Sequence, residues 1–368
     1  TLDKTQDPGA TRHAELSAQS ATLESQKRQP AFAMGATDAG PAAPATHILY
    51  QGVFRDLREE VVPGFPSVLF PGPANVNAPT DKTTGRRLAL ANWITSPGNP
   101  WTARVIVNRI WQQHFGEGLV ATPNDFGLTG TRPTHPELLD WLATSFVRNG
   151  WSIKWLHRTI VMSAAWQRAS SHHVAAVGTD PDNRLLWRQN VRRLDAETLR
   201  DGLLKVSGLL RNYDGGRPLW PEVPQQLLSA QPAILEAIEG KDDGRRQGWY
   251  TDPVEATDVR SLYLVRKRCL PVPFLQAFDL PDSTVSCARR DSTVVAPQAL
   301  MLLNSPAAVR YAEAFADRVS QVVERSSGQS AVSAQLSQMI ETVFQLALVR
   351  DPEPAEAELA LQFLRRHA

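Results

Sequence analysis

The sequence predicts a mainly α fold: a multi-helix globular bundle with a few short β-strands and long loops rich in proline and glycine. Two observations support this prediction. Apolar residues recur at helical spacing over residues 86–170 and again after residue 297. Proline stands in the first turn of several of these segments, where its missing N–H costs a helix little. Hydrophobic residues make up 42% of the 368 residues, so the chain can bury a sizeable core.

The composition divides the chain into three parts. Residues 1–30 are a polar N-terminal segment, in which a short helix is expected over 14–28. Residues 31–85 are rich in Ala, Pro and Gly and predict an extended strap with one short strand over 47–53. The helical domain then occupies residues 86–368.

The first half of the helical domain predicts four helices. One of them begins after Thr134-His135-Pro136-Glu137, where Thr134 is expected to be the N-cap and Glu137 the acid of a capping box. A Gly or a Ser-Pro-Gly sequence ends the first two. The helices are expected over 87–95, 102–115, from 136 through 146, and 153–163.

The second half predicts a helix over 195–210, capped by Asp195. Residues 211–258 are rich in Gly, Pro and charge, so we expect a long, loop-rich insertion on the surface. Alternation of β-branched and aromatic residues predicts a strand over 260–266. Further helices are expected over 297–303, 306–324, 331–349 and 354–366.

The charges nearly cancel, with 39 Lys plus Arg against 38 Asp plus Glu, so the balance does not point to nucleic acid. No apolar run approaches the ~18 residues of a membrane span. The sequence contains no CxxCH, so we expect no haem on this chain, and no metal motif of the HExxH type. Cys269 and Cys287 could form one bridge, but two free thiols are the favoured interpretation.

Polar residues gather on the helix expected over 102–115. Asn108, Trp111 and His114 follow one another at i,i+3 and share a stripe, with Arg109 beside it. Such a stripe could bind a sugar, with the indole under the ring and the amide and imidazole on its hydroxyls. The alternative, which we favour, is a half-buried helix whose polar side chains satisfy loop backbone.

Two more positions allow a functional and a structural interpretation. Asp125 lies in a turn sequence and is expected to close an Asx-turn. His135, with Asp140 five residues on, could do acid–base chemistry. A lone histidine near a helix start is more often structural, and we favour that role.

The densest charge cluster surrounds Asp195, Glu197, Arg200 and Asp201. Two carboxylates on one helical face could form a glycosidase pair or bind a metal. An ion-pair network with the neighbouring arginines is the favoured interpretation.

The segment before residue 297 predicts an anion site. Arg289 and Arg290 lie beside hydroxyl residues and a helix start. The same arginines would favour a Cys287 thiolate, although no histidine follows nearby. Gln298 and Asn304 could bind a ligand or only hold the loop.

Several long motifs carry a family resemblance. They include NPWTARVIVNRIWQQHFGEG, PTHPELLDWLA, RRLDAETLRDGLL and FDLPDSTVSCARRDSTVVAPQALMLLNSP. Over residues 35–368 the chain resembles the domain of unknown function 1553, also called the planctomycete surface domain. That domain forms the C-terminal part of large secreted proteins of planctomycetes and related bacteria.

The resemblance implies a periplasmic, cell-surface or secreted location and a longer parent polypeptide. It also implies neighbouring cytochrome-c-like domains, which would carry any haem. The family has no established reaction, so the resemblance marks motif positions without assigning catalytic roles.

Two functional hypotheses follow. The first is an interaction or structural module that docks other domains or subunits of a secreted assembly, such as a c-type cytochrome. The second is a polysaccharide-binding or polysaccharide-hydrolysing domain. The second expects a set of polar residues to converge on one cleft beside Trp111 or Trp166: Asn108, His114, His135, Asp195 and Glu197.

Overall fold

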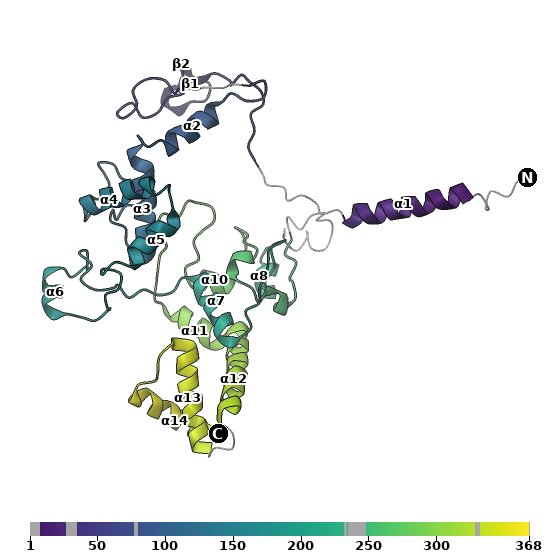
Figure 1. Cartoon of the computed structure of the whole chain (residues 1–368), viewed down its shortest axis with the longest axis vertical. Helices are drawn as coiled ribbons and strands as arrows, with labels where there is room; N and C mark the ends of the chain where they lie inside the picture. The colour runs from purple at the N-terminus through teal and green to yellow at the C-terminus, as the bar shows by residue number, and fades with distance from the viewer. Residues whose placement is uncertain are drawn as a thin grey trace, which may run out of the picture. The chain divides into compact units, whose positions relative to one another are not determined.

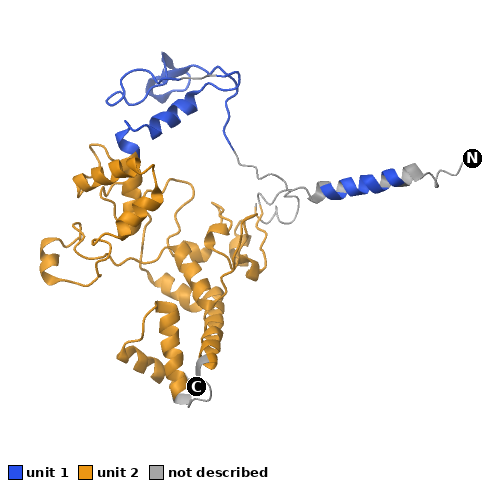
Figure 2. Cartoon of the chain, in the orientation of Figure 1, with its two compact units in different colours: residues 1–102 blue, residues 103–368 orange. Residues whose placement is uncertain are grey.

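A computed structural model describes residues 8–26, 35–76, 80–231, 234, 248–327 and 332–367. These residues contain thirteen α-helices and a single two-stranded sheet, which confirms the predicted mainly α class. The chain forms two compact units, residues 1–102 and 103–368 (Figure 2). Within the described part of the chain, none of the helices is long and apolar enough to cross a membrane.

The first unit contains the N-terminal helix, the sheet and the helix that follows the strap. Strands β1 and β2 pair antiparallel, with Thr46 opposite Val61. The strand predicted over 47–53 is wrong beyond Leu49, because the chain turns there through a short 3-10 helix in which Gln51 has φ 49°. Strand β2 was not predicted, since all five of its residues are exposed and show no alternation. The elements are α1 (Pro8–Gln26), β1 (Thr46–Leu49), η1 (Tyr50–Gly52), β2 (Leu57–Val61) and α2 (Arg86–Thr95).

The strap is tied to α2 by aromatic and charged contacts. Trp93 of α2 stacks on Phe65, with ring centroids 4.6 Å apart. The Asp38 carboxylate accepts from Thr83 Oγ1 at 2.6 Å and pairs with Arg87 at 2.7 Å. The hydrogen bond from Thr83 is the first cause of a lowered Asp38 pKa, followed by that from the Thr84 backbone. These contacts hold an otherwise irregular segment in place.

A first core forms where α3 (Pro100–Phe115) packs with α4 (Pro136–Arg148) and α5 (Ile153–Val161) (Figure 1). The apolar positions predicted for these helices supply it. Its larger buried side chains are Val107, Trp111, Phe115, Leu139, Leu142, Phe146, Leu156 and Ile160.

The sequence predicts the start of α5 correctly and the cap of α4 wrongly. Ser152 caps α5 and accepts from the Trp155 N–H at 3.2 Å. The capping box predicted for α4 is wrong: His135 is the N-cap and makes no side-chain cap bond. Thr134 is instead bonded to the preceding loop, where its N–H and its hydroxyl both donate to the Leu119 carbonyl.

A second core surrounds α7 (Ala196–Ser207), α8 (Gln225–Ser229) and α10 (Pro273–Ala277). Asp195 caps α7 as predicted, accepting from the Thr198 N–H at 3.2 Å. Contrary to the prediction from the sequence, residues 211–258 do not lie wholly on the surface. The segment is loop-rich, yet its Trp220 and Trp249 are buried in this core. Hydrophobic burial therefore outweighs the polar composition of the segment.

The strand predicted over 260–266 is also wrong. The chain forms η3 (Ser261–Tyr263) there, and Leu264 makes only an isolated bridge to Leu219. The Asp201 carboxylate accepts both the N–H and the hydroxyl of Ser261, each at 2.7 Å. These bonds take the backbone donor that a strand partner would need.

The second unit also contains α6 (Val174–Thr179), which was not predicted, and four helices close to the predicted ranges: α11 (Ala296–Asn304), α12 (Pro306–Ser327), α13 (Val332–Leu348) and α14 (Pro354–His367). α12 packs against both α7 and α13, and α13 packs against α14 (Figure 1). Arg318 of α12 donates to the Lys205 and Val206 carbonyls at the end of α7, where a cation is favoured. A short 3-10 helix, η2 (Val254–Thr257), lies ahead of η3.

Candidate functional site

Asn108 on α3 is fully buried and bonded at both side-chain atoms. Its Nδ2 donates to the Val120 carbonyl at 3.0 Å, and its Oδ1 accepts from the Val120 N–H at 2.8 Å. A Cβ added at Gly118 would lie 2.6 Å from Asn108 Nδ2, so the loop approaches the amide closely. The amide therefore pairs the loop backbone, and its complete burial leaves no surface for a ligand to reach.

The other polar residues of the predicted stripe separate. Trp111 is buried and stacks on Phe115, with centroids 4.3 Å apart. Arg109 is exposed and donates to Asn124 Oδ1 at 3.1 Å. His114 lies 2.8 Å, Nε2 to Nδ1, from His157 of α5, a partner that the sequence analysis missed. A buried indole cannot offer its face to a sugar ring.

The His114–His157 pair predicts a pH dependence. Burial, then His157 and Arg192, lower the pKa of His114, so the fold favours its neutral form. The contribution of neutral His114 to the stability of the fold is complete above the ordinary histidine pKa. It is lost as the pH falls through the lowered pKa that His114 has in the folded state. In an NMR titration, we expect the His114 pKa to lie below its ordinary value and to rise in His157→Gln. Because burial is the first cause, the rise should be partial; an unchanged pKa would contradict the coupling between the two rings.

Asp125 and His135 both have local partners. Asp125 Oδ1 accepts the Gly127 N–H at 2.8 Å, and its Oδ2 accepts Thr129 Oγ1 at 2.6 Å, which together close an Asx-turn. The Thr129 bond is the first cause of the lowered Asp125 pKa. His135 Nδ1 lies 3.0 Å from the hydroxyl of the preceding Thr134. Asp140, the carboxylate predicted as a possible acid–base partner of His135, pairs instead with Arg104 at 2.8 Å.

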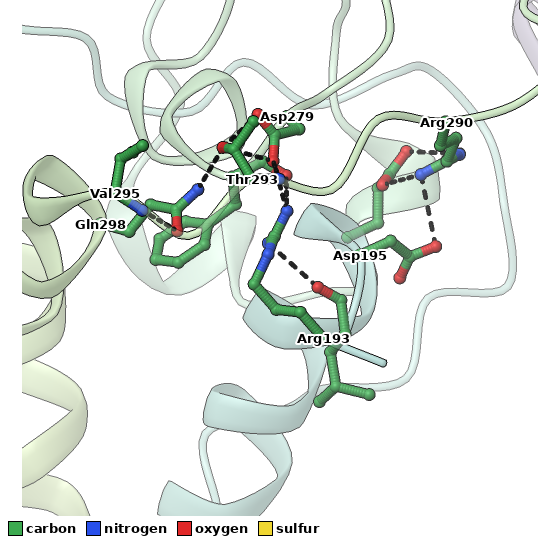
Figure 3. Close-up of polar contacts among 10 residues, drawn as sticks. Arg193, Asp195, Asp279, Arg290, Thr293, Val295 and Gln298 are labelled. Carbon is green, nitrogen blue, oxygen red and sulfur yellow. Dashed lines mark hydrogen bonds and ion pairs between the residues drawn. The ribbon is translucent and has the colours of Figure 1, made fainter. Parts of the chain in front are cut away.

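Asp195 and Glu197 form an ion-pair cluster with Arg290 (Figure 3). Arg290 Nη1 and Nη2 donate to the two Glu197 oxygens at 2.6 and 3.1 Å, and Nη1 also reaches Asp195 at 3.3 Å. The Glu197 bond is the first cause of a raised Arg290 pKa. The arginine that holds Glu197 therefore comes from the loop before α11, 93 residues away, rather than from Arg200 one turn along the helix.

Arg200 faces a different neighbour. Its side chain is buried and donates to three groups of the segment that contains η2 and η3. The acceptors are the Thr257 carbonyl at 2.7 Å, the Val259 carbonyl at 2.9 Å and the Ser261 hydroxyl at 3.2 Å. Arg200 thus links α7 to an irregular segment about sixty residues later in the chain.

A second polar network lies on the other side of the segment before α11 (Figure 3). Asp279 accepts from the Thr293 N–H at 2.8 Å and from Arg193 at 2.5 Å. Gln298 donates to Thr293 Oγ1 at 3.1 Å and accepts from the Val295 N–H at 3.4 Å. The Thr293 backbone bond is the first cause of the lowered Asp279 pKa. Asp279 was not among the predicted site residues, because its partners lie 14 and 86 residues away in the sequence.

Between these networks and α3 there is a hollow of about 290 Å³. Of the residues predicted from the sequence, it holds Arg289 and Arg290, together with Cys287. The Gln112 amide of α3 donates to the Ala288 carbonyl at 3.2 Å. The other lining residues are Gln113, Arg266, Pro281, Asp282 and Ser283.

The lining of the hollow does not include the last candidate, Asn304, or the second cysteine, Cys269. Asn304 is exposed at the end of α11. Cys269 and Cys287 are both free and exposed, as favoured by the sequence. Among the described residues, no three His, Cys, Asp or Glu side chains gather as a metal-binding group.

A family comparison covers most of this architecture. The sequence model of the family described as PSD1, "Protein of unknown function (DUF1553)", matches residues 86–364. The chain belongs to this family. The matched range includes all candidate residues of the DUF1553 domain named above, and it begins with α2. No curated protein and no solved structure matches the chain.

Proposed function

We propose that this DUF1553 chain is an extracytoplasmic interaction module of a larger secreted or surface assembly, and that it docks a c-type-cytochrome-like domain. The observation that supports this is the use of the motif side chains inside the fold. Asn108 bonds the Val120 backbone, Arg200 bonds two carbonyls, and Arg290 neutralises Glu197. Groups engaged in this way build a scaffold rather than a reaction centre.

Helix α11 offers the surface for such docking. Gln298 is buried and Met301 packs on the second core, whereas Leu300 and Leu303 on the other face are 55% and 72% exposed. The helix sequence APQALMLLN contains no charge. An apolar patch on the partner would cover these two leucines and bury them, as residues at the centre of a protein interface are buried. The haem would belong to the partner, because this chain has no CxxCH.

Replacement of both leucines tests the docking. In cell-envelope fractions, we expect the amount of c-type haem protein cross-linked to the tagged chain to fall at least tenfold in Leu300→Glu/Leu303→Glu. The reason is that docking of this variant would bury two carboxylates. The measurement is haem staining of the cross-linked band. Leu128→Glu, which changes an exposed leucine of a loop, is the matched control and should retain the band. Absence of a haem-stained band with the unaltered chain, or equal bands with both variants, would refute the proposal.

Saccharide binding is the second candidate, favoured by the arginine-lined hollow beside α3. Hydrolysis receives less support than binding. A general acid or nucleophile needs a carboxyl group that can reach the substrate, whereas Arg290 engages both Glu197 oxygens.

A further inference from the structure

The hollow beside α3 has the size and the lining of a small-ligand site. Its volume of about 290 Å³ lies just below the ~300–1,000 Å³ of small-molecule pockets, so it suits one sugar ring rather than a long chain. Three arginines and one aspartate line it, which leaves an excess of positive charge: Arg266, Arg289, Arg290 and Asp282.

The charged residues of the lining are not equally available. Arg290 is paired with Glu197 and Asp195, and Arg266 donates to the Pro281 carbonyl at 2.7 Å. The Asp282 carboxylate accepts the Thr284 N–H at 2.8 Å. Among the described residues, the Arg289 guanidinium has no hydrogen-bond or ion-pair partner. Arg289 is therefore the group best able to bind an anion in a bidentate manner.

Gln112 supplies an independent indication of a ligand. Its side chain is only 9% exposed, and its Oε1 is buried without any hydrogen-bond partner. A buried amide oxygen that lacks a donor costs free energy, so it favours a ligand that carries one. An ammonium donor would be repelled by the positive charge of the arginines, so a neutral donor matches the site, and the hydroxyl of a sugar ring is one.

We propose that this hollow binds a uronate sugar. The carboxylate of the sugar pairs with Arg289, and a ring hydroxyl donates to Gln112 Oε1. Ser283 and Gln113 line the same hollow and offer further polar partners for ring hydroxyls. The inference rests on the saccharide-binding candidate and is independent of the docking through α11, so each can fail alone.

Two cysteines allow a direct test. Cys287 lines the hollow and Cys269 does not, while both are exposed and free. We expect sodium galacturonate at millimolar concentration to slow alkylation of Cys287 by iodoacetamide at least threefold and to leave Cys269 unchanged. Peptide mass spectrometry measures both rates in the same sample, with NaCl used to equalise ionic strength.

Two comparison ligands and two variants complete the test. Galactose lacks the carboxylate and sodium acetate lacks the hydroxyls, so neither should protect Cys287. Arg289→Gln should abolish protection without loss of folding, and Arg132→Gln, which changes another exposed arginine outside the lining, should retain it. Equal protection by acetate or galactose, no protection by galacturonate, or full protection in Arg289→Gln would each overturn the proposal.

Discussion

Replacement of Arg200 by leucine is expected to lower the free energy of unfolding by about 2–6 kcal/mol, because two buried carbonyls lose their donor at about 1–3 kcal/mol each. Arg200 is only 6% exposed, and its guanidinium donates to the Thr257 and Val259 carbonyls and to the Ser261 hydroxyl. Leucine fills part of the space but donates to none of them. The Thr257 and Val259 carbonyls would remain buried without partners, and η3 would be linked to α7 only through the bonds of Ser261 to Asp201.

Urea denaturation measures this effect as a shift of the midpoint at constant slope. Arg211→Leu is the matched control, because Arg211 is exposed and makes a single bond to the Glu255 carbonyl of the same segment. We expect the control to cost about 1 kcal/mol or less. Equal losses in the two variants would show that burial of Arg200 does not determine its contribution.

The second large effect is expected at Asn108. Asn108→Leu keeps the approximate size of the side chain but removes both hydrogen bonds to the Val120 backbone. Val120 is nearly fully buried, so water cannot replace these bonds. Each unpaired buried backbone group costs about 1–3 kcal/mol, so we expect a loss of about 2–5 kcal/mol in the free energy of unfolding. Asn124→Leu, at an exposed asparagine of the same region, should change stability by less than about 1 kcal/mol.

A variant on the opposite side of the same contact provides an independent check. Gly118→Ala would place a Cβ 2.6 Å from Asn108 Nδ2 and 2.7 Å from the Val120 carbonyl oxygen. Part of its cost should vanish in an Asn108→Ala background, because the amide that it meets is then absent. Strict additivity of the two changes would contradict this account of the loop.

Local signals predicted the helices well. Ser152 and Asp195 cap α5 and α7 as expected, because a cap and the N–H that it accepts lie within one turn of the chain. Apolar spacing likewise identified Leu139, Leu142 and Phe146 as buried residues of α4. Each of these signals involves residues no more than a few positions apart.

The sequence-based predictions failed where a residue bonds a group that is distant in the sequence and not a near neighbour. Thr134 bonds the Leu119 carbonyl and does not cap α4, and Ser261 of the segment 260–266 bonds Asp201 and has no strand partner at its N–H. Similarly, the charge cluster at Glu197 was expected to involve nearby arginines, but Arg290 lies 93 residues away. No periodic pattern reports which remote loop will supply a partner.

The sequence alone was sufficient for the mainly α class, the positions of the long helices, their apolar faces and the DUF1553 family. Tertiary structure alone decided which polar groups meet. It brought Gln112 of α3 to the loop of Arg289, paired His114 with His157, and buried Arg200 against Val259. The physical reason is that helical periodicity depends on neighbours three and four residues apart, whereas polar pairing depends on how loops close between helices.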